Sequence, residues 1–78
     1  MKLVIAKVDQ VFYDGEAYSL TAPGRDGEMT ILTDHMPLVT TLKPGELSLR
    51  EHAGSEPKKF PVVSGVLEVR HDGATVIL

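Results

Sequence analysis

Three side chains that could do chemistry stand close together in one polar stretch of the sequence, residues 24–38. Glu28 and Asp34 carry carboxylates, and His35 carries an imidazole. A carboxylate can bind a basic side chain or a metal ion, and an imidazole can bind a metal or exchange a proton near neutral pH. An Asp26–Gly27 pair opens the stretch and a proline closes it, so we expect a turn-bounded contact surface there.

A metal site would need more ligands than this stretch supplies. The other two histidines, His52 and His71, fall in separate predicted loops, and the chain has no cysteine. Zinc sites take three or four ligands, and the histidines show no ligand spacing. Ser64–Gly65 lacks the preceding glycine of a nucleophile elbow, and no glycine-rich phosphate loop is present. The sequence therefore predicts no catalytic residue, no metal and no cofactor.

The pattern alone allows two interpretations of Glu28, Asp34 and His35. They could be solvated side chains at a strand end and in a turn. Alternatively, Glu28 presents its charge to a cationic partner. Six acidic residues lie between positions 9 and 34, and Arg25 is the only basic residue there. That half of the domain should carry a negative field that steers a basic partner.

Length and charge limit the class of protein. A chain of 78 residues makes one domain, and at this size apolar burial barely exceeds the lost chain entropy. We therefore expect a compact two-layer fold or a partner that covers part of the surface. A net charge of −3 argues against a nucleic-acid partner and against insertion into anionic lipid. No apolar run approaches the ~18 residues of a membrane helix, and no signal peptide is evident, so we expect a cytoplasmic protein.

Short strands must position these residues. Turn signals recur every 8–12 residues or so, and this spacing is typical of an all-β sandwich or barrel. Turns are expected at Asp14–Gly15 and at Asp26–Gly27, the latter with positive φ at both residues. Leu47 and Leu49 should point inward, and Pro61 predicts an edge strand. The predicted strands cover residues 2–8, 11–13, 16–22, 28–32, 37–42, 46–50, 58–63, 66–70 and 74–78.

Four stretches, in order, resemble the N-terminal domain of the epsilon subunit of F-type ATP synthases. They are GEMTILTDHMPLVT (27–40), LKPG (42–45), VSGVLEV (63–69) and ATVIL (74–78). Each stretch is modest alone, but four at the right intervals are specific and span nearly the whole chain. The resemblance implies one domain over residues 1–78, an all-β flattened sandwich of about ten short, mostly antiparallel strands.

The resemblance also implies a function. The family member is a non-catalytic subunit of the rotating central stalk, peripheral to the cytoplasmic face of the bacterial inner membrane. It binds the gamma subunit and the c-ring and couples proton or sodium flow to ATP synthesis. The stretch matching residues 27–35 faces the c-ring, whose loop carries an arginine. Glu28, Asp34 and His35 are thereby implied as ring contacts, with no small-molecule substrate.

The chain departs from the family in three places. Thr30 and Thr33–Asp34 replace residues that are often Gly and Pro-Gly or Pro-Asn, and Ser64–Gly65 replaces a double glycine. The C-terminal helical hairpin of the family is expected to be absent, and with it the inhibitory and nucleotide-sensing functions. The alternative is a free-standing β-sandwich binding module, or a small metal-dependent enzyme, that uses Glu28, Asp34 and His35.

Overall fold

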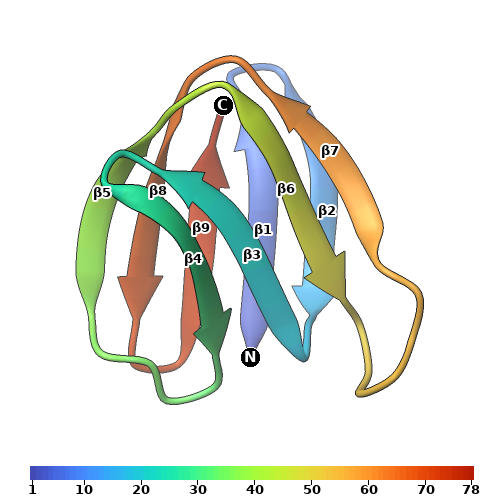
Figure 1. Ribbon diagram of the computed structural model, residues 1–78. Helices are drawn as coiled ribbons and strands as arrows, with labels where there is room; N and C mark the ends of the chain where they lie inside the picture. The colour runs from blue at the N-terminus through green and yellow to red at the C-terminus, as the bar shows by residue number, and fades with distance from the viewer.

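The computed structural model describes every residue from Met1 to Leu78, and all of its regular secondary structure is strand (Figure 1). The nine strands are β1 (Lys2–Lys7), β2 (Gln10–Glu16), β3 (Ser19–Gly24), β4 (Gly27–Leu32), β5 (Leu38–Leu42), β6 (Gly45–Arg50), β7 (Lys58–Val62), β8 (Gly65–Arg70) and β9 (Gly73–Ile77). None of the structure's elements is a helix long and apolar enough to span a bilayer.

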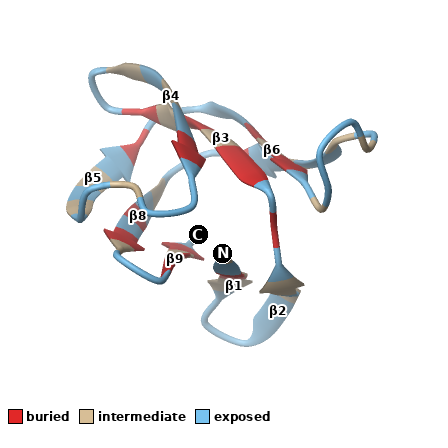
Figure 2. Cartoon of the chain, turned by 90° about the horizontal axis from the view of Figure 1, so that it is seen from below, coloured by how far each residue is buried: buried red, intermediate tan, exposed pale blue.

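The strands form one sheet that curls into two layers. The strand order is β2-β1-β9-β8-β5-β3-β6-β7, and β4 pairs with the other edge of β3. Strands β5, β8, β9, β1 and β2 make one layer, and β4, β3, β6 and β7 lie over it (Figures 1 and 2). Only the β1–β9 pairing is parallel. The prediction of a flattened, mostly antiparallel all-β sandwich is confirmed, with nine strands rather than about ten.

Alternating side chains of both layers fill the space between them. Side chains of a strand point to opposite faces, so every second residue reaches the core. Leu47 and Leu49 of β6 are fully buried, as predicted. Each such leucine stabilises the fold by about 1.5–3 kcal/mol relative to leaving it in water. The core consists of Leu3, Ile5, Ala17, Leu20, Ala22, Ile31, Leu42, Leu47, Leu49, Val62, Leu67, Val69, Ala74 and Val76.

The predicted turn at Asp14–Gly15 is wrong. Both residues lie inside β2, where Asp14 pairs with Val4 and Gly15 pairs with Leu3. The chain reverses earlier, between Lys7 and Gln10. Because β1 offers a partner along the whole of β2, ladder formation overrides the local turn preference of the Asp-Gly pair.

The β3–β4 turn exists but differs in geometry from the prediction. Its loop residues are Arg25 and Asp26, since Gly24 pairs with Gly27. Gly27 has φ of 135°, whereas Asp26 has no positive φ, so the predicted positive pair is wrong. Gly24 is needed for a close approach, because a Cβ there would lie 2.9 Å from the carbonyl oxygen of Gly27. The hairpin is therefore made by two glycines that flank the loop.

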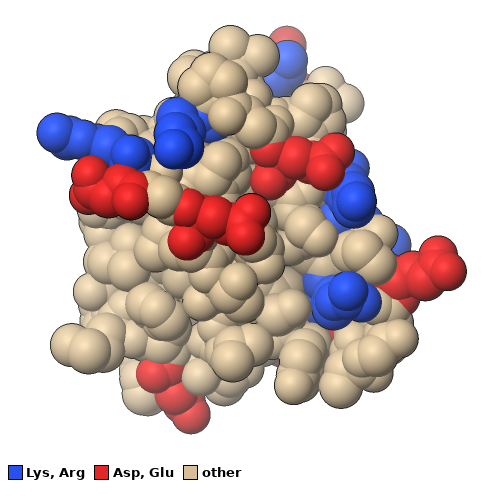
Figure 3. Space-filling view, viewed as in Figure 1, with Lys and Arg blue, Asp and Glu red and all other residues tan.

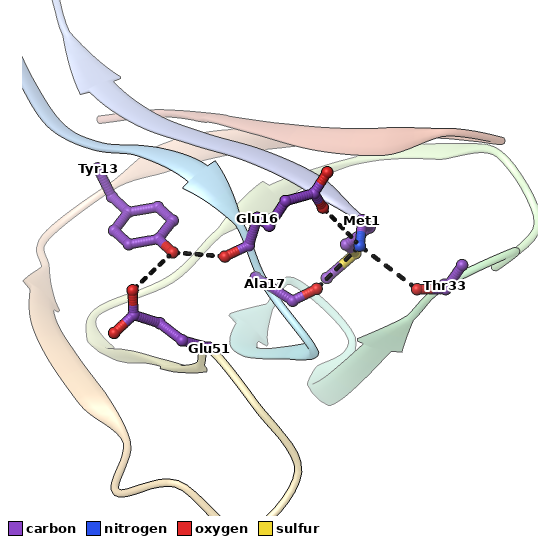
Figure 4. A network of polar contacts seen from close by, with 6 residues as sticks. All are labelled: Met1, Tyr13, Glu16, Ala17, Thr33 and Glu51. Atoms are coloured by element: carbon purple, nitrogen blue, oxygen red, sulfur yellow. Dashed lines mark hydrogen bonds and ion pairs between the residues drawn. The ribbon is translucent and has the colours of Figure 1, made fainter.

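Polar contacts bridge the layers on the side where β2 and β7 form open edges (Figure 4). Tyr13 Oη on β2 donates to the carbonyl oxygen of Glu16 at 2.5 Å and lies 3.3 Å from Glu51 Oε2, just beyond β6. Lys58 Nζ on β7 lies 3.1 Å from Glu51 Oε1. Partial burial and the nearby Glu51 carboxylate raise the pKa of Tyr13. Pro61 lies on β7, which confirms the predicted edge strand.

The first residue ties the two layers together at the lower end of the molecule. The α-ammonium group of Met1 donates to the carbonyl oxygen of Ala17 at 2.9 Å (Figure 4). It also lies 3.2 Å from Glu16 Oε2 and 3.4 Å from the Thr33 hydroxyl. Thr33 begins the β4–β5 loop, so these contacts help to fix the loop that follows β4.

Candidate functional site

Glu28, Asp34 and His35 are placed by β4 and the loop after it. Glu28 is the second residue of β4, and Asp34 and His35 lie in the connection to β5, residues 33–37. A six-residue strand spans about 20 Å. The structure therefore does not gather the three side chains into one compact loop: Glu28 lies near one end of β4, and Asp34 and His35 lie beyond the other.

A row of exposed side chains along β4 connects the two ends. Glu28, Thr30 and Leu32 are exposed and alternate with Met29 and Ile31, which point toward the core. The row continues into Asp34 and His35 of the loop. Five residues make up what we call the β4 stripe: Glu28, Thr30, Leu32 and Asp34, which are exposed, and His35, which is half-buried. Sequence reasoning missed Thr30 and Leu32, although alternation counted from Glu28 would have found them.

The loop holds Asp34 and His35 in defined positions. Asp34 has φ of 66°, the only positive value outside glycine. The backbone N–H of His35 donates to the carbonyl oxygen of Leu32 at 3.2 Å. His35 Nδ1 lies 2.8 Å from the carbonyl oxygen of Met36. Since a carbonyl can only accept, this geometry assigns the hydrogen to Nδ1 and leaves Nε2 available to a partner.

The carboxylates of the stripe differ in their neighbours. Asp34 Oδ1 lies 3.9 Å from His71 Nε2 of the β8–β9 turn. Glu28 forms no ion pair and no side-chain hydrogen bond within the chain, and Asp26 of the neighbouring turn forms none either. A charge without an internal partner can engage an external cation without first breaking a contact.

The expected negative field between residues 9 and 34 is weaker than the sequence suggests. Lys2 Nζ lies 3.2 Å from Asp14, and the Met1 ammonium lies 3.2 Å from Glu16. These contacts partly balance the charge of β2. Figure 3 shows most charged side chains over the upper half and the right side of one face, while the lower left is largely uncharged. The acidic residues without an internal partner near the β3–β4 turn are Asp26 and Glu28.

A groove opens beside Glu28, between the start of β4 and the first residues of β5. It has a volume of about 410 Å³. One side is lined by the β3–β4 hairpin and the other by β5. The lining residues are Gly24, Asp26, Gly27, Glu28, Met29, Leu38, Val39 and Thr40. The groove is lined by both acidic and apolar residues, which suits a protein segment with basic and apolar residues.

Glu28, Asp34 and His35 are not grouped together as metal ligands. No group of three or more His, Asp or Glu side chains lies close enough together to hold a metal ion. Asp34 Oδ1 and His71 Nε2 form a pair at 3.9 Å. What the site can do chemically is bind charged and hydrogen-bonding groups on another surface.

Known proteins are similar to this chain over nearly its whole length. The chain matches, over residues 1–78, the family described as ATP synthase, Delta/Epsilon chain, beta-sandwich domain. It is 40% identical over 77 residues to ATP synthase epsilon chain 2 of Burkholderia orbicola, covering 99% of this chain and 51% of that protein. It is 36% identical to the ATP synthase epsilon chain of Clostridium kluyveri, covering 58% of that protein. The chain thus spans about half the length of these relatives.

Solved structures share the fold. A chain in the cryo-EM structure of the Euglena gracilis mitochondrial ATP synthase with its c-ring superposes with a TM-score of 0.89 at 22% identity. The match covers 99% of this chain and 49% of that one. A chain of the Tetrahymena thermophila ATP synthase central stalk and c-ring superposes with a TM-score of 0.80 at 15% identity, covering 97% of this chain and 60% of that one. With the match over residues 1–78, the chain belongs to the β-sandwich domain family of the ATP synthase delta and epsilon chains.

Proposed function

We propose that this domain acts as a non-catalytic coupling element of the central stalk of an F-type ATP synthase. In this role it docks on the gamma subunit and on the c-ring, at the cytoplasmic face of a bacterial inner membrane. The observation that carries the proposal is the family match over the whole chain, together with 40% identity to an epsilon chain. Coupling here means that the domain transmits rotation of the ring while carrying out no reaction itself.

The β4 stripe is the proposed contact with the c-ring. Glu28 supplies a carboxylate without an internal partner, and an arginine on the ring loop would form a charge-assisted hydrogen bond with it. His35 supplies Nε2, and Leu32, which is 48% exposed, supplies an apolar side chain between the two polar ends. An exposed ion pair contributes only about 0–1 kcal/mol. An interface excludes water, so loss of Glu28 there should cost about 2 kcal/mol or more.

The test compares Glu28→Ala and His35→Ala with the control Glu56→Ala. Glu56 is an exposed acid in the loop between β6 and β7 and has no ion-pair partner. We expect the two stripe variants to attach more weakly to the membrane sector, with the Glu28 defect largest at low salt, where its charge is least screened. Thermal stability should stay unchanged in both variants, because neither side chain belongs to the core. His35→Ala should also keep its gamma binding.

Two results would count against the ring contact. If both stripe variants attach to the membrane sector like the Glu56→Ala control at every salt concentration, the stripe does not face the ring. If they instead lose thermal stability together with attachment, the residues are structural. Failure of the unaltered domain to bind either gamma or the membrane sector would overturn the proposed function as a whole.

A further inference from the structure

The groove between β4 and β5 is bordered by strand edges that have no partner. β4 pairs only with β3, so its other edge is open. β5 pairs with β8 along its length but meets β3 only at Leu42. The first part of β5, from Leu38 to Thr40, therefore has one free edge. Open edges of this kind can accept an added strand from another chain.

Two backbone hydrogen bonds show which N–H and C=O groups of β5 point toward the groove. Thr41 accepts from the backbone N–H of Arg25 at 2.9 Å, and Lys43 donates to the carbonyl oxygen of Pro23 at 3.0 Å. In a strand, the N–H and C=O of one residue point to the same side, and the side alternates along the chain. Val39 must therefore point its N–H and C=O to the same side as Thr41, toward the groove.

The groove also limits what an added segment can be. Met29, Leu38 and Val39 supply apolar walls. Asp26 and Glu28, whose carboxylates have no internal partner, line the groove, whereas Arg25 does not. An extended segment with an apolar residue facing the walls and a basic residue near Asp26 would complement both features. A neutral or acidic segment would bury uncompensated carboxylates.

We propose that the gamma subunit docks by adding an extended, basic segment as a strand to the open edge of β5, with its backbone hydrogen-bonded to Val39. This inference rests on the proposed function, because it takes gamma as the partner. The position also agrees with the proposed ring contact, since the β4 stripe is formed by side chains that point outward from β4. The ring would contact the β4 stripe and gamma the open edge of β5, and the two surfaces meet at Glu28, which also lines the groove.

The direct test is amide hydrogen exchange of the whole domain with and without purified gamma subunit. The Val39 amide has no strand partner in the free domain, so it should exchange rapidly. With gamma bound, its exchange should slow by at least about tenfold, as expected for a newly paired strand amide. The Val11 amide on distant β2 serves as an internal reference and should not change.

Two substitutions separate backbone pairing from side-chain contact. Val39→Pro removes the N–H, and proline is tolerated on an open edge because no internal bond is lost. Val39→Ala shortens the exposed side chain but keeps the N–H. We expect Val39→Pro to weaken gamma binding about tenfold or more, and Val39→Ala to change it less than about threefold. Asp26→Asn should weaken binding at low salt, whereas Glu56→Gln should not.

The outcomes are distinguishable. If gamma binds tightly while the Val39 amide keeps exchanging rapidly, the added strand is wrong and the proposed function stands. Equal weakening by Val39→Pro and Val39→Ala would also overturn the added strand, because it would assign the contact to the side chain. If Val39→Pro fails to fold, the exchange measurement on the unaltered domain decides. If gamma does not bind at all, the proposed function and this inference fall together.

Discussion

At the scale of single residues, two glutamates show how the surroundings of a carboxylate assign its role. Glu51 lies 3.1 Å from Lys58 Nζ and 3.3 Å from the Tyr13 hydroxyl, so its charge is engaged within the fold. Glu28 has no such neighbour and lines a groove. The sequence pattern alone does not distinguish them, because each follows or precedes a turn. The two glutamates differ in whether a partner side chain lies nearby, and that depends on tertiary structure.

The contact between Glu51 and Lys58 should make the stability of the fold depend on pH. The hydrogen bond and charge of Lys58 lower the pKa of Glu51 from its ordinary value of 4.5. A carboxyl group whose pKa is lowered in the folded state stabilises the protein above its unfolded pKa, and the effect is lost as pH falls through the folded pKa. We therefore expect Glu51→Gln to unfold at lower urea than the unaltered chain at pH 7.

The difference should shrink progressively once the pH falls below 4.5. Urea unfolding at a series of pH values measures it. Glu56→Gln, in the same loop, is the matched control and should stay close to the unaltered chain throughout. A difference for Glu51→Gln that stays constant down to pH 3 would mean that the charge of Glu51 does not contribute to stability.

At the scale of elements, alternation predicted most strands, but it did not predict their partners. β6, with Leu47 and Leu49 inward, and the edge strand with Pro61 agree with the prediction. The prediction of a turn at Asp14–Gly15 is wrong because a turn preference depends only on neighbouring residues. The pairing of β2 with β1 depends on a second strand. The candidate site was predicted as one stretch but is spread along β4. Neither the open edge of β5 nor the groove could be predicted from the sequence, because both depend on which strands do not pair with each other.

Gly65, at the start of β8, has no room for a side chain. The structure shows why position 65 is glycine. A Cβ at Gly65 would lie 2.6 Å from the carbonyl oxygen of Ile77 and 3.1 Å from Leu78 Cδ2. Because the first neighbour is backbone of the paired strand β9, it cannot move aside without disturbing the ladder. Gly65→Ala should therefore lower the free energy of unfolding by about 1–3 kcal/mol.

Gly15→Ala is the matched control. A Cβ at Gly15 would meet only the Tyr13 ring, at 3.6 Å or more, which is an ordinary contact. Replacing glycine by alanine at a compatible position reduces the entropy of the unfolded chain, so this variant should be neutral or slightly more stable, by up to about 1 kcal/mol. Chemical denaturation of both variants provides the comparison. Equal free energies of unfolding for the two variants would show that β9 can shift to make room for a Cβ at position 65 at no cost in stability.

At the scale of the whole molecule, the fold is closed by strands from the two ends of the sequence. β1 and β9 pair in parallel, with Leu3 opposite Ala74 and Ile5 opposite Val76. All four of these side chains are fully buried. The two strands lie at the centre of the five-stranded layer, between β2 and β8. The layer therefore cannot form until nearly the whole chain is available.

This closure predicts an all-or-none dependence on β9. A chain of residues 1–72 lacks β9, so β1 and β8 each lose a partner and the core loses Ala74 and Val76. At about 5–15 kcal/mol for a typical domain, the total stability is too small to absorb that loss. We expect residues 1–72 to give the narrow amide dispersion of an unfolded chain in NMR spectra. Residues 1–77, which keep every strand, should give a dispersed spectrum.

The same topology sets the folding rate of the whole chain. Pairing β1 with β9 joins residues about seventy positions apart, so much chain entropy is lost before the central ladder stabilises the fold. Domains dominated by such distant pairings fold in milliseconds to seconds. Stopped-flow refolding of residues 1–78, followed by far-ultraviolet circular dichroism, should show a phase in that range. A dispersed spectrum for residues 1–72, or refolding within microseconds, would mean that the remaining strands form a stable unit without the closing pair.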